Sequence, residues 1–510
     1  MTGGVIQSID YAAVAAPLVL VLVAGLVLLL DAFLPARPGG ARVLGLVTLG
    51  GLAAALAVVA VQAASGATRR TFCVPASLAG ETAAASCSFV ADRFTLVVAA
   101  VVLAAGLVVV LLSMTEIAGA GPGERGRIPA GEWYFLLLAT LAGAVLLPAS
   151  RDLVMLVVSL ELVSLPVFAL TALRRHDGRA AEAALKLFLV SVVSTAITLF
   201  GVSLLYGVTG SVHLDRIDAA LRTAGSTVGD TGGDMAQVTA AAMVLVVAGF
   251  AFKIAAVPFH FWAADVYHGA PIPVAALLSV VSKASGFAGL ILLLTSALPG
   301  RAALWAPGVA VVAALTMTAG NVLAMRQRAA VRLLAWSSVA QSGYILAPLA
   351  AYAAEPRVAV GASIAYLVFY AAMNLIAFAV VMLVSQREGG DLEAYRGLVS
   401  RSPAAGLALA FSLVCLAGLP PGLAGLFAKI VVFRAVVDGG LGWLAVVMAA
   451  NTVAGLYYYI AWTSRLFAPP AAGESRTVTA RAAAGVAVAV TVAVTVIFSV
   501  APQVVLSVTG

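Results

Sequence analysis

The chain consists of long apolar stretches separated by short polar connections. About fourteen stretches reach 17 or more residues, long enough for a helix to cross a hydrocarbon core of roughly 30 Å. These stretches are residues 12–34, 43–64, 93–114, 131–149, 152–173, 182–207, 237–262, 271–297, 304–325, 329–351, 358–384, 404–437, 441–467 and 481–503. Backbone groups inside lipid need internal partners, so each stretch is expected to be helical. The pattern predicts an all-α polytopic membrane protein with about 14 transmembrane helices.

Composition agrees with this pattern and excludes several classes of function. The 510 residues are 63% hydrophobic and only 10% charged, and the mean hydropathy is +1.10. The connections are too short for a soluble catalytic domain; the longest polar gaps are 208–236 and 385–402, which we expect to be loops. The net charge of +7 comes from arginines between the stretches, which points to a lipid bilayer and not to nucleic acid. The first stretch lacks a basic leader and a small-residue cleavage site, so it is interpreted as a first span.

Arginine asymmetry gives an orientation. With the N-terminus outside, the connections that face inward contain more arginines, which predicts that both termini lie outside the membrane. Cys73 and Cys87 then share one outward connection, where a disulfide is chemically permitted. Whether the two cysteines pair is left open by the sequence. Cys415 lies in an apolar stretch and is expected to be a packing residue.

Two stretches are interrupted by proline. In 237–262, Pro258 follows Lys253; in 404–437, the run Gly418-Leu419-Pro420-Pro421-Gly422 precedes Lys429. Proline removes a helical hydrogen bond, and such a break survives in lipid only where protein or water satisfies the backbone. Simple kinks are the alternative explanation. Two breaks in corresponding halves, each beside a lysine, favour an inverted-repeat transporter with its site near the membrane midplane.

The two breaks, helices 7 and 12, define a domain organisation with two inverted five-helix repeats. We expect residues 1–129 to form helices 1–3, 130–298 the first repeat with helices 4–8, 299–468 the second repeat with helices 9–13, and 469–510 helix 14.

The lysines are the strongest indication of chemistry. All four of them, Lys186, Lys253, Lys283 and Lys429, lie in apolar stretches, whereas the 25 arginines lie mostly in connections. An ammonium at mid-bilayer costs roughly +2.5 to +3.5 kcal/mol on insertion scales. Lysine can release its proton in a buried site and arginine cannot. With Glu161 as a single buried carboxylate, these lysines are predicted to be stations on a proton path; the alternative is an ion pair that fixes two helices.

Polar residues accompany these ionisable groups. Ser279, Ser282 and Gly286 share a helical face with Lys283 and are expected to leave room for water. The alternative is that small polar residues let helices pack closely. His260 follows Lys253 by seven residues and is a candidate relay, because histidine titrates near neutrality.

The sequence contains no phosphate loop, nucleotide fingerprint, haem motif, cluster-binding cysteine pattern or metal-ligand spacing. We therefore expect no cofactor and no metal bound by this chain, and no redox chemistry by the chain alone.

Several motifs together resemble one membrane-protein family. They are Leu160-Glu161-Leu162, Phe252-Lys253-Ile254-Ala255-Ala256-Val257-Pro258-Phe259-His260-Phe261-Trp262, Tyr267-His268-Gly269-Ala270-Pro271, Gly418-Leu419-Pro420-Pro421-Gly422, and the run from Arg332 to Tyr344. The chain resembles the antiporter-like membrane subunits of respiratory NADH–quinone oxidoreductase (complex I) and the related Mrp-type cation/proton antiporters, over about residues 130 to 470. Within the family it is similar to the subunit N type, because it lacks the lateral C-terminal helix of subunit L and has lysine where subunit M has glutamate in helix 12.

The resemblance implies a role for each ionisable residue. Glu161 would be the fifth-helix glutamate that modulates the seventh-helix Lys253. Lys186 would be the sixth-helix lysine of this subunit type, Lys283 the central eighth-helix lysine, and Lys429 the lysine on the exit side. Splitting the Glu161–Lys253 pair would push the proton of Lys253 along water toward Lys283 and Lys429.

The resemblance also implies a setting. The chain would be a non-redox, proton-translocating subunit of an NADH:quinone oxidoreductase in a bacterial cell membrane, with no catalysis by the isolated chain. Flavin, iron–sulfur clusters and quinone would belong to other subunits, and the partners would be other membrane subunits, especially neighbouring antiporter-like ones. A subunit of an Mrp-type Na⁺/H⁺ antiporter and a non-conducting assembly scaffold remain alternatives, and an organic-solute carrier is disfavoured because no pocket chemistry stands out.

Overall fold

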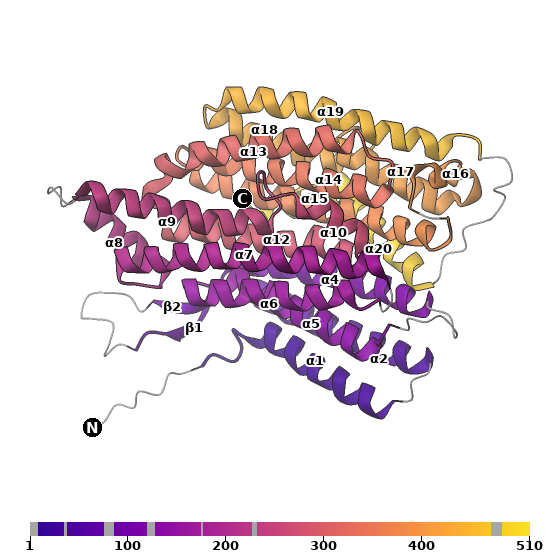
Figure 1. The fold of residues 1–510 in the computed structure, drawn as a ribbon, viewed down its shortest axis with the longest axis horizontal. Helices are drawn as coiled ribbons and strands as arrows, with labels where there is room; N and C mark the ends of the chain where they lie inside the picture. The colour runs from indigo at the N-terminus through magenta and orange to yellow at the C-terminus, as the bar shows by residue number, and fades with distance from the viewer. Residues whose placement is uncertain are drawn as a thin grey trace.

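The computed structural model describes residues 9–34, 38–75, 86–119, 128–174, 177–226, 232–388, 390–470 and 482–509. These residues form a bundle of helices that run roughly parallel and antiparallel to one another, with a two-stranded hairpin at one end (Figure 1). Helix α1 lies along one edge of the bundle and α19 along the opposite edge. The all-α membrane fold predicted from the apolar stretches is confirmed.

The first half of the chain runs from α1 to α12. Its elements are α1 (Ala15–Phe33), α2 (Pro38–Ser65), β1 (Arg69–Cys73), β2 (Cys87–Ala91), α4 (Arg93–Gly119), α5 (Ala130–Leu146), the 3₁₀ turn η1 (Leu147–Ala149), α6 (Leu153–Ala172), α7 (Gly178–Thr209), α8 (Leu214–Ser226), α9 (Gly232–Lys253), α10 (Trp262–Gly269), α11 (Ile272–Leu277), the π turn η2 (Leu278–Ser282) and α12 (Lys283–Leu292). The polar gap 208–236, expected to be a loop, therefore contains the short helix α8.

The second half begins with two further turns, the π turn η3 (Leu293–Ala297) and the 3₁₀ turn η4 (Pro299–Arg301). It continues with α13 (Ala302–Ala324), α14 (Ala330–Leu346), the 3₁₀ turn η5 (Ala347–Ala351), α15 (Pro356–Glu388), the 3₁₀ turn η6 (Leu392–Tyr395), α16 (Leu398–Arg401), α17 (Pro403–Ala417), α18 (Leu423–Asp438), α19 (Gly442–Phe467), α20 (Ala482–Val500) and α21 (Gln503–Thr509). The two most deeply enclosed spans are Ile272–Ala297 and Pro356–Ser385, whose most apolar windows are 100% and 94% buried inside the protein. They form the centre around which the site is built.

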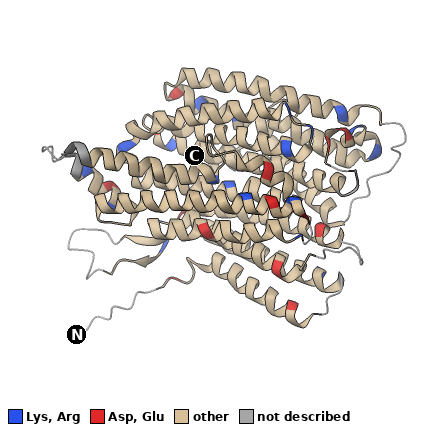
Figure 2. Ribbon diagram, viewed as in Figure 1, with Lys and Arg blue, Asp and Glu red and all other residues tan. Residues whose placement is uncertain are grey.

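Twelve helices in the described part of the chain are long and apolar enough to cross a membrane. Helix α14 and the pair α17 and α18 are shorter, so the total of about 14 spans stays a prediction. Figure 2 shows most charged residues near helix ends, with a few in the middle of the bundle.

Both predicted breaks are present. Helix α9 ends at Lys253 and α10 begins only at Trp262, so the seventh stretch stops earlier than expected. Between them Ala255 adopts a positive φ of 56°, a left-handed conformation that is costly for a residue with a side chain. Helix α17 ends at Ala417, where Gly418 has a φ of 80°, and α18 begins at Leu423.

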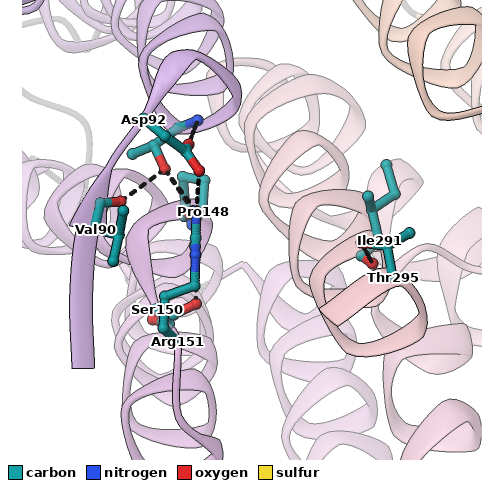
Figure 3. Close-up of polar contacts among 8 residues, drawn as sticks. Val90, Asp92, Pro148, Ser150, Arg151, Ile291 and Thr295 are labelled. Atoms are coloured by element: carbon teal, nitrogen blue, oxygen red, sulfur yellow. Dashed lines mark hydrogen bonds and ion pairs between the residues drawn. The ribbon is translucent and has the colours of Figure 1, made fainter. Parts of the chain in front are cut away.

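The hairpin is closed by a disulfide and tied to the bundle by an arginine. Cys73 and Cys87 face each other across β1 and β2 and form the disulfide, which resolves the pairing that the sequence left open. Arg151 donates 2.6 Å to the Asp92 carboxylate and 2.9 Å to the Pro148 carbonyl, which ties the end of β2 to the start of α6 (Figure 3). Figure 3 also shows Thr295 in η3 donating 2.7 Å to the carbonyl of Ile291.

Candidate functional site

Lys253 is held at the point where α9 stops. Its side chain is 7% exposed, and its ammonium donates a hydrogen bond of 2.8 Å to the Ser164 hydroxyl on α6. Gly286 on α12 makes room for the stem of the side chain, because a Cβ there would lie 3.0 Å from the Lys253 Cγ. The glycine expected to leave room for water near Lys283 therefore leaves room for the other lysine.

Glu161 lies one turn before Ser164 on the same helix. It is half-buried and accepts a hydrogen bond of 2.6 Å from the Thr195 hydroxyl on α7. The expected direct pair with Lys253 does not form, because the Lys253 ammonium bonds to Ser164 instead. Each of the two charges is therefore bonded to a hydroxyl, Glu161 to Thr195 and Lys253 to Ser164.

A small cavity adjoins Lys253. It has a volume of ≈10 Å³ and is lined by the serines Ser164, Ser191 and Ser282 together with Trp262 and other apolar residues. The Ser282 hydroxyl is buried and has no hydrogen-bond partner among the described residues. A space of about this size, with hydroxyl groups in its lining, is just large enough for one water molecule. Such a water would connect the Lys253 side of the cavity to the residue directly before Lys283.

Lys283 is the most deeply buried of the four lysines, with 1% exposure. It begins α12 immediately after the π turn η2, a local irregularity that is frequent at functional sites. Its ammonium donates to the Ser342 hydroxyl at 2.8 Å and to the Ser338 carbonyl, both on α14. The Ser342 hydroxyl in turn donates 2.8 Å to the Ile254 carbonyl, beside Lys253. The two lysines are therefore linked through one hydroxyl and a stretch of backbone.

Lys429 lies on α18 behind the second break. It is 7% exposed and donates 2.6 Å to the Ala417 carbonyl, which the end of α17 leaves without a helical partner. A Cβ at Gly418 would lie 2.8 Å from the Lys429 Cδ. Each break thus brings a lysine against a glycine. On its other side the ammonium lies 5.6 Å from the centre of the Tyr344 ring, within cation–π range.

Buried tyrosines occupy the region between Lys283 and Lys429. Tyr370 donates 2.7 Å to the Ser338 hydroxyl, and Tyr366 stacks on Tyr344 with ring centres 5.8 Å apart. Tyr366 donates to the Gln341 side-chain carbonyl, and the Gln341 amide donates 3.2 Å to Tyr459. The tyrosines were not predicted from the sequence, in which their only signal is a hydroxyl inside otherwise apolar stretches.

Lys186 is not buried as the other three lysines are. It was expected inside the membrane without a carboxylate of its own, but its side chain is 45% exposed on α7. It forms ion pairs with Glu182 at 2.7 Å and with Asp265 at 3.2 Å, and Asp265 also pairs with Arg332 at 3.1 Å. Lys186 therefore has two exposed carboxylate partners, distinct from the predicted Glu161.

His260 lies in the turn between α9 and α10. Its ring packs edge-on against Trp336 with centres 5.6 Å apart, and its Nδ1 has no hydrogen-bond partner among the described residues. The structure brings it to α14 and shows no hydrogen bond from it to a lysine. Within the described ranges, no group of three His, Cys, Asp or Glu side chains is placed to hold a metal ion.

Comparison with known protein families agrees with the geometry. The family described as NADH:quinone oxidoreductase/Mrp antiporter, transmembrane, matches residues 150–455, which contain Glu161 and all four lysines. The chain is 52% identical over 484 residues to NADH-quinone oxidoreductase subunit N 2 of Streptomyces griseus, covering 94% of this chain and 86% of that protein.

Solved structures give the same result. A chain of respiratory complex I from Thermus thermophilus with bound aureothin is 30% identical, with a TM-score of 0.76 over 96% of this chain and 98% of that one. A chain of the Mrp complex from Dietzia sp. DQ12-45-1b has a TM-score of 0.77 over 96% of this chain and 95% of that one. At 23% identity, this second likeness shows a shared fold alone.

Proposed function

This chain belongs to the subunit N family of antiporter-like membrane subunits of NADH–quinone oxidoreductase, and from that premise we propose how its buried residues translocate protons. The function of the chain is that of a proton-translocating membrane subunit, which works as part of a multi-subunit membrane complex. The roles of individual residues, set out below, are our proposal.

One observation carries the proposal: three lysines are buried in the protein, and two of them, Lys253 and Lys283, are connected through the Ser342 hydroxyl and the Ile254 backbone. Lys253, Lys283 and Lys429 are 7%, 1% and 7% exposed, and their ammonium groups bond to serine or to backbone carbonyls. No carboxylate of a described residue lies within ion-pair distance of any of them. Buried cations without a neutralising partner are expensive in a membrane and are typical of ion and proton pathways.

The proposed route begins at Glu161 and Lys253. When charge movement elsewhere in the complex weakens the hold of Glu161, Lys253 releases its proton through Ser164 and the adjoining cavity toward Lys283. Lys283 passes it on past the tyrosines to Lys429. Hydroxyl groups suit this task because each can both donate and accept a hydrogen bond. His260, whose ring packs against Trp336 of α14, is proposed as a relay on that side.

Redox chemistry is proposed to lie outside this chain. We propose that flavin, iron–sulfur clusters and quinone bind to other subunits, that the isolated chain catalyses nothing, and that its neighbours include other antiporter-like subunits. The proposed location is a bacterial plasma membrane, with both termini outside. Arginine asymmetry between the two sides supports this orientation.

A test of the setting is to tag the chain, purify it in mild detergent, and assay NADH-driven quinone reduction while identifying its companions. Co-purifying flavin, iron–sulfur proteins and inhibitor-sensitive activity are expected. A redox-silent assembly of membrane proteins alone would contradict the proposal and favour the Mrp-type antiporter, whose fold the chain shares.

A further inference from the structure

Asp265 holds two cations that come from different helices. Its Oδ2 lies 3.2 Å from the Lys186 ammonium on α7, and its Oδ1 lies 3.1 Å from the Arg332 guanidinium on α14. Lys186 has a second carboxylate, Glu182, one turn away on its own helix. Asp265 is thus the only residue of this cluster that lies on α10. It therefore connects α10 to both α7 and α14.

Helix α10 is also in contact with the buried site. Trp262, its first residue, is 4% exposed, donates 3.2 Å to the Phe252 carbonyl, and lines the cavity beside Lys253. Tyr267 is fully buried and packs on Trp262, with ring centres 6.2 Å apart. One face of this short helix therefore carries the exposed Asp265 carboxylate, and another face, with Trp262, lines the cavity next to Lys253.

Helix α10 is not continuous with the helix before it or the helix after it. Residues 254–261 before it form turns and no regular helix, and Ala270 after it is extended. Its position therefore depends on side-chain contacts. At Gly269 the backbone of α10 lies close against α7, because a Cβ there would lie 2.6 Å from the Ala183 Cβ and 2.7 Å from the Arg179 carbonyl oxygen.

We infer that Asp265 is a positioning residue for proton translocation: by bridging Lys186 and Arg332 it seats α10, and through Trp262 it sets the shape of the Lys253 cavity. The inference rests on the proposed function. Without the Asp265 charge, Lys186 keeps Glu182 whereas Arg332 loses the only carboxylate it pairs with among the described residues. Helix α10 is then no longer drawn toward α14, and the cavity no longer keeps the volume that fits one water.

The test uses the intact complex reconstituted in vesicles, with proton uptake and NADH oxidation measured together. Asp265→Asn is expected to lower the proton-to-electron ratio at least twofold while the complex still assembles and oxidises NADH. Asp265→Glu, which keeps the charge, is expected to restore most of the ratio. Glu182→Gln is the matched control, because it removes the other partner of Lys186 without touching α10, and it should keep the wild-type ratio.

A second variant displaces α10 without changing any charge. Gly269→Ala places a methyl group against the backbone of α7 and is expected to lower the proton-to-electron ratio as Asp265→Asn does. Gly207→Ala is the control: Gly207 lies on α7, a Cβ there would meet nothing within 4 Å, and the ratio should stay at the wild-type value. If Lys283→Met abolishes pumping but Asp265→Asn or Gly269→Ala keeps a wild-type ratio, the inference about Asp265 is overturned and the proposed function is not. A wild-type ratio in Lys283→Met as well would instead overturn the proposed function.

Discussion

The ammonium of Lys253 donates a hydrogen bond of 2.8 Å to the Ser164 hydroxyl, which lies one helical turn from Glu161. The buried cation is thus bonded to a neutral hydroxyl and not to the carboxylate one turn away. A direct ion pair in a site of low dielectric would hold the proton firmly on the lysine. A hydrogen bond to a neutral serine holds the proton less firmly and leaves the lysine able to release it.

Ser164→Ala tests this intermediate hydroxyl. The substitution removes the acceptor of the Lys253 hydrogen bond, and a buried donor left without a partner costs about 1–3 kcal/mol. We expect a lower proton-to-electron ratio in the reconstituted complex. Ser203→Ala is the control, because Ser203 is exposed and bonds only to its own helix. Equal ratios in the two variants would show that Ser164 has no part in the transfer.

Gly286→Ala tests the packing of the Lys253 stem. The added Cβ would lie 3.0 Å from the Lys253 Cγ and 3.1 Å from the Ile254 Cγ2, closer than ordinary contact, so the lysine must shift. We expect slower coupled turnover with normal assembly. Gly308→Ala, whose new Cβ meets nothing within 4 Å, should behave as wild type. If Gly286→Ala pumps at the wild-type rate, the position of the stem is not important.

Tyr366→Phe tests the region between Lys283 and Lys429. It removes the hydroxyl that bonds to Gln341 but keeps the ring that stacks on Tyr344. We expect a proton-to-electron ratio lowered by a few-fold, with little change in assembly. Tyr352→Phe is a suitable comparison, because the Tyr352 ring packs on Trp305 away from the lysines. An unchanged ratio in Tyr366→Phe would exclude its hydroxyl from the route.

The Cys73–Cys87 disulfide is expected to stabilise the hairpin and to have no effect on proton translocation. Replacing Cys73 and Cys87 by serine releases a loop constraint worth about 3 kcal/mol for a loop of this length. We expect faster proteolysis at the hairpin end of the bundle and a wild-type proton-to-electron ratio. A reduced ratio would show that the hairpin influences the pathway.

The sequence predicted the broken helices well, because the physical cause is local. Pro258 cannot continue a helix, and α9 accordingly ends before it, at Lys253. The burial of Lys253, Lys283 and Lys429 also followed from long apolar flanks on both sides. The short helix α8 was missed because it is polar and lies in a loop, where no membrane pattern marks it.

What the sequence could not supply is the side of a helix that a residue occupies. Lys186 lies in an apolar stretch like the other lysines, but α7 is one of the least enclosed spans and turns this residue outward. Its partner Asp265 is 79 residues away in the chain, so only the folded structure reveals the ion pair. The tyrosines were missed for a related reason: an isolated tyrosine in an apolar stretch is as typical of a packed core as of a polar network.

The central claim, that protons pass through the buried lysines, is tested most directly at Lys283, which is 1% exposed and lies between the other two. The measurement is the proton-to-electron ratio of the purified complex in sealed vesicles, for wild type and Lys283→Met, with subunit content checked in both. The account predicts an assembled Lys283→Met complex that still contains its redox subunits but translocates far fewer protons per electron. A wild-type ratio in that complex would contradict it.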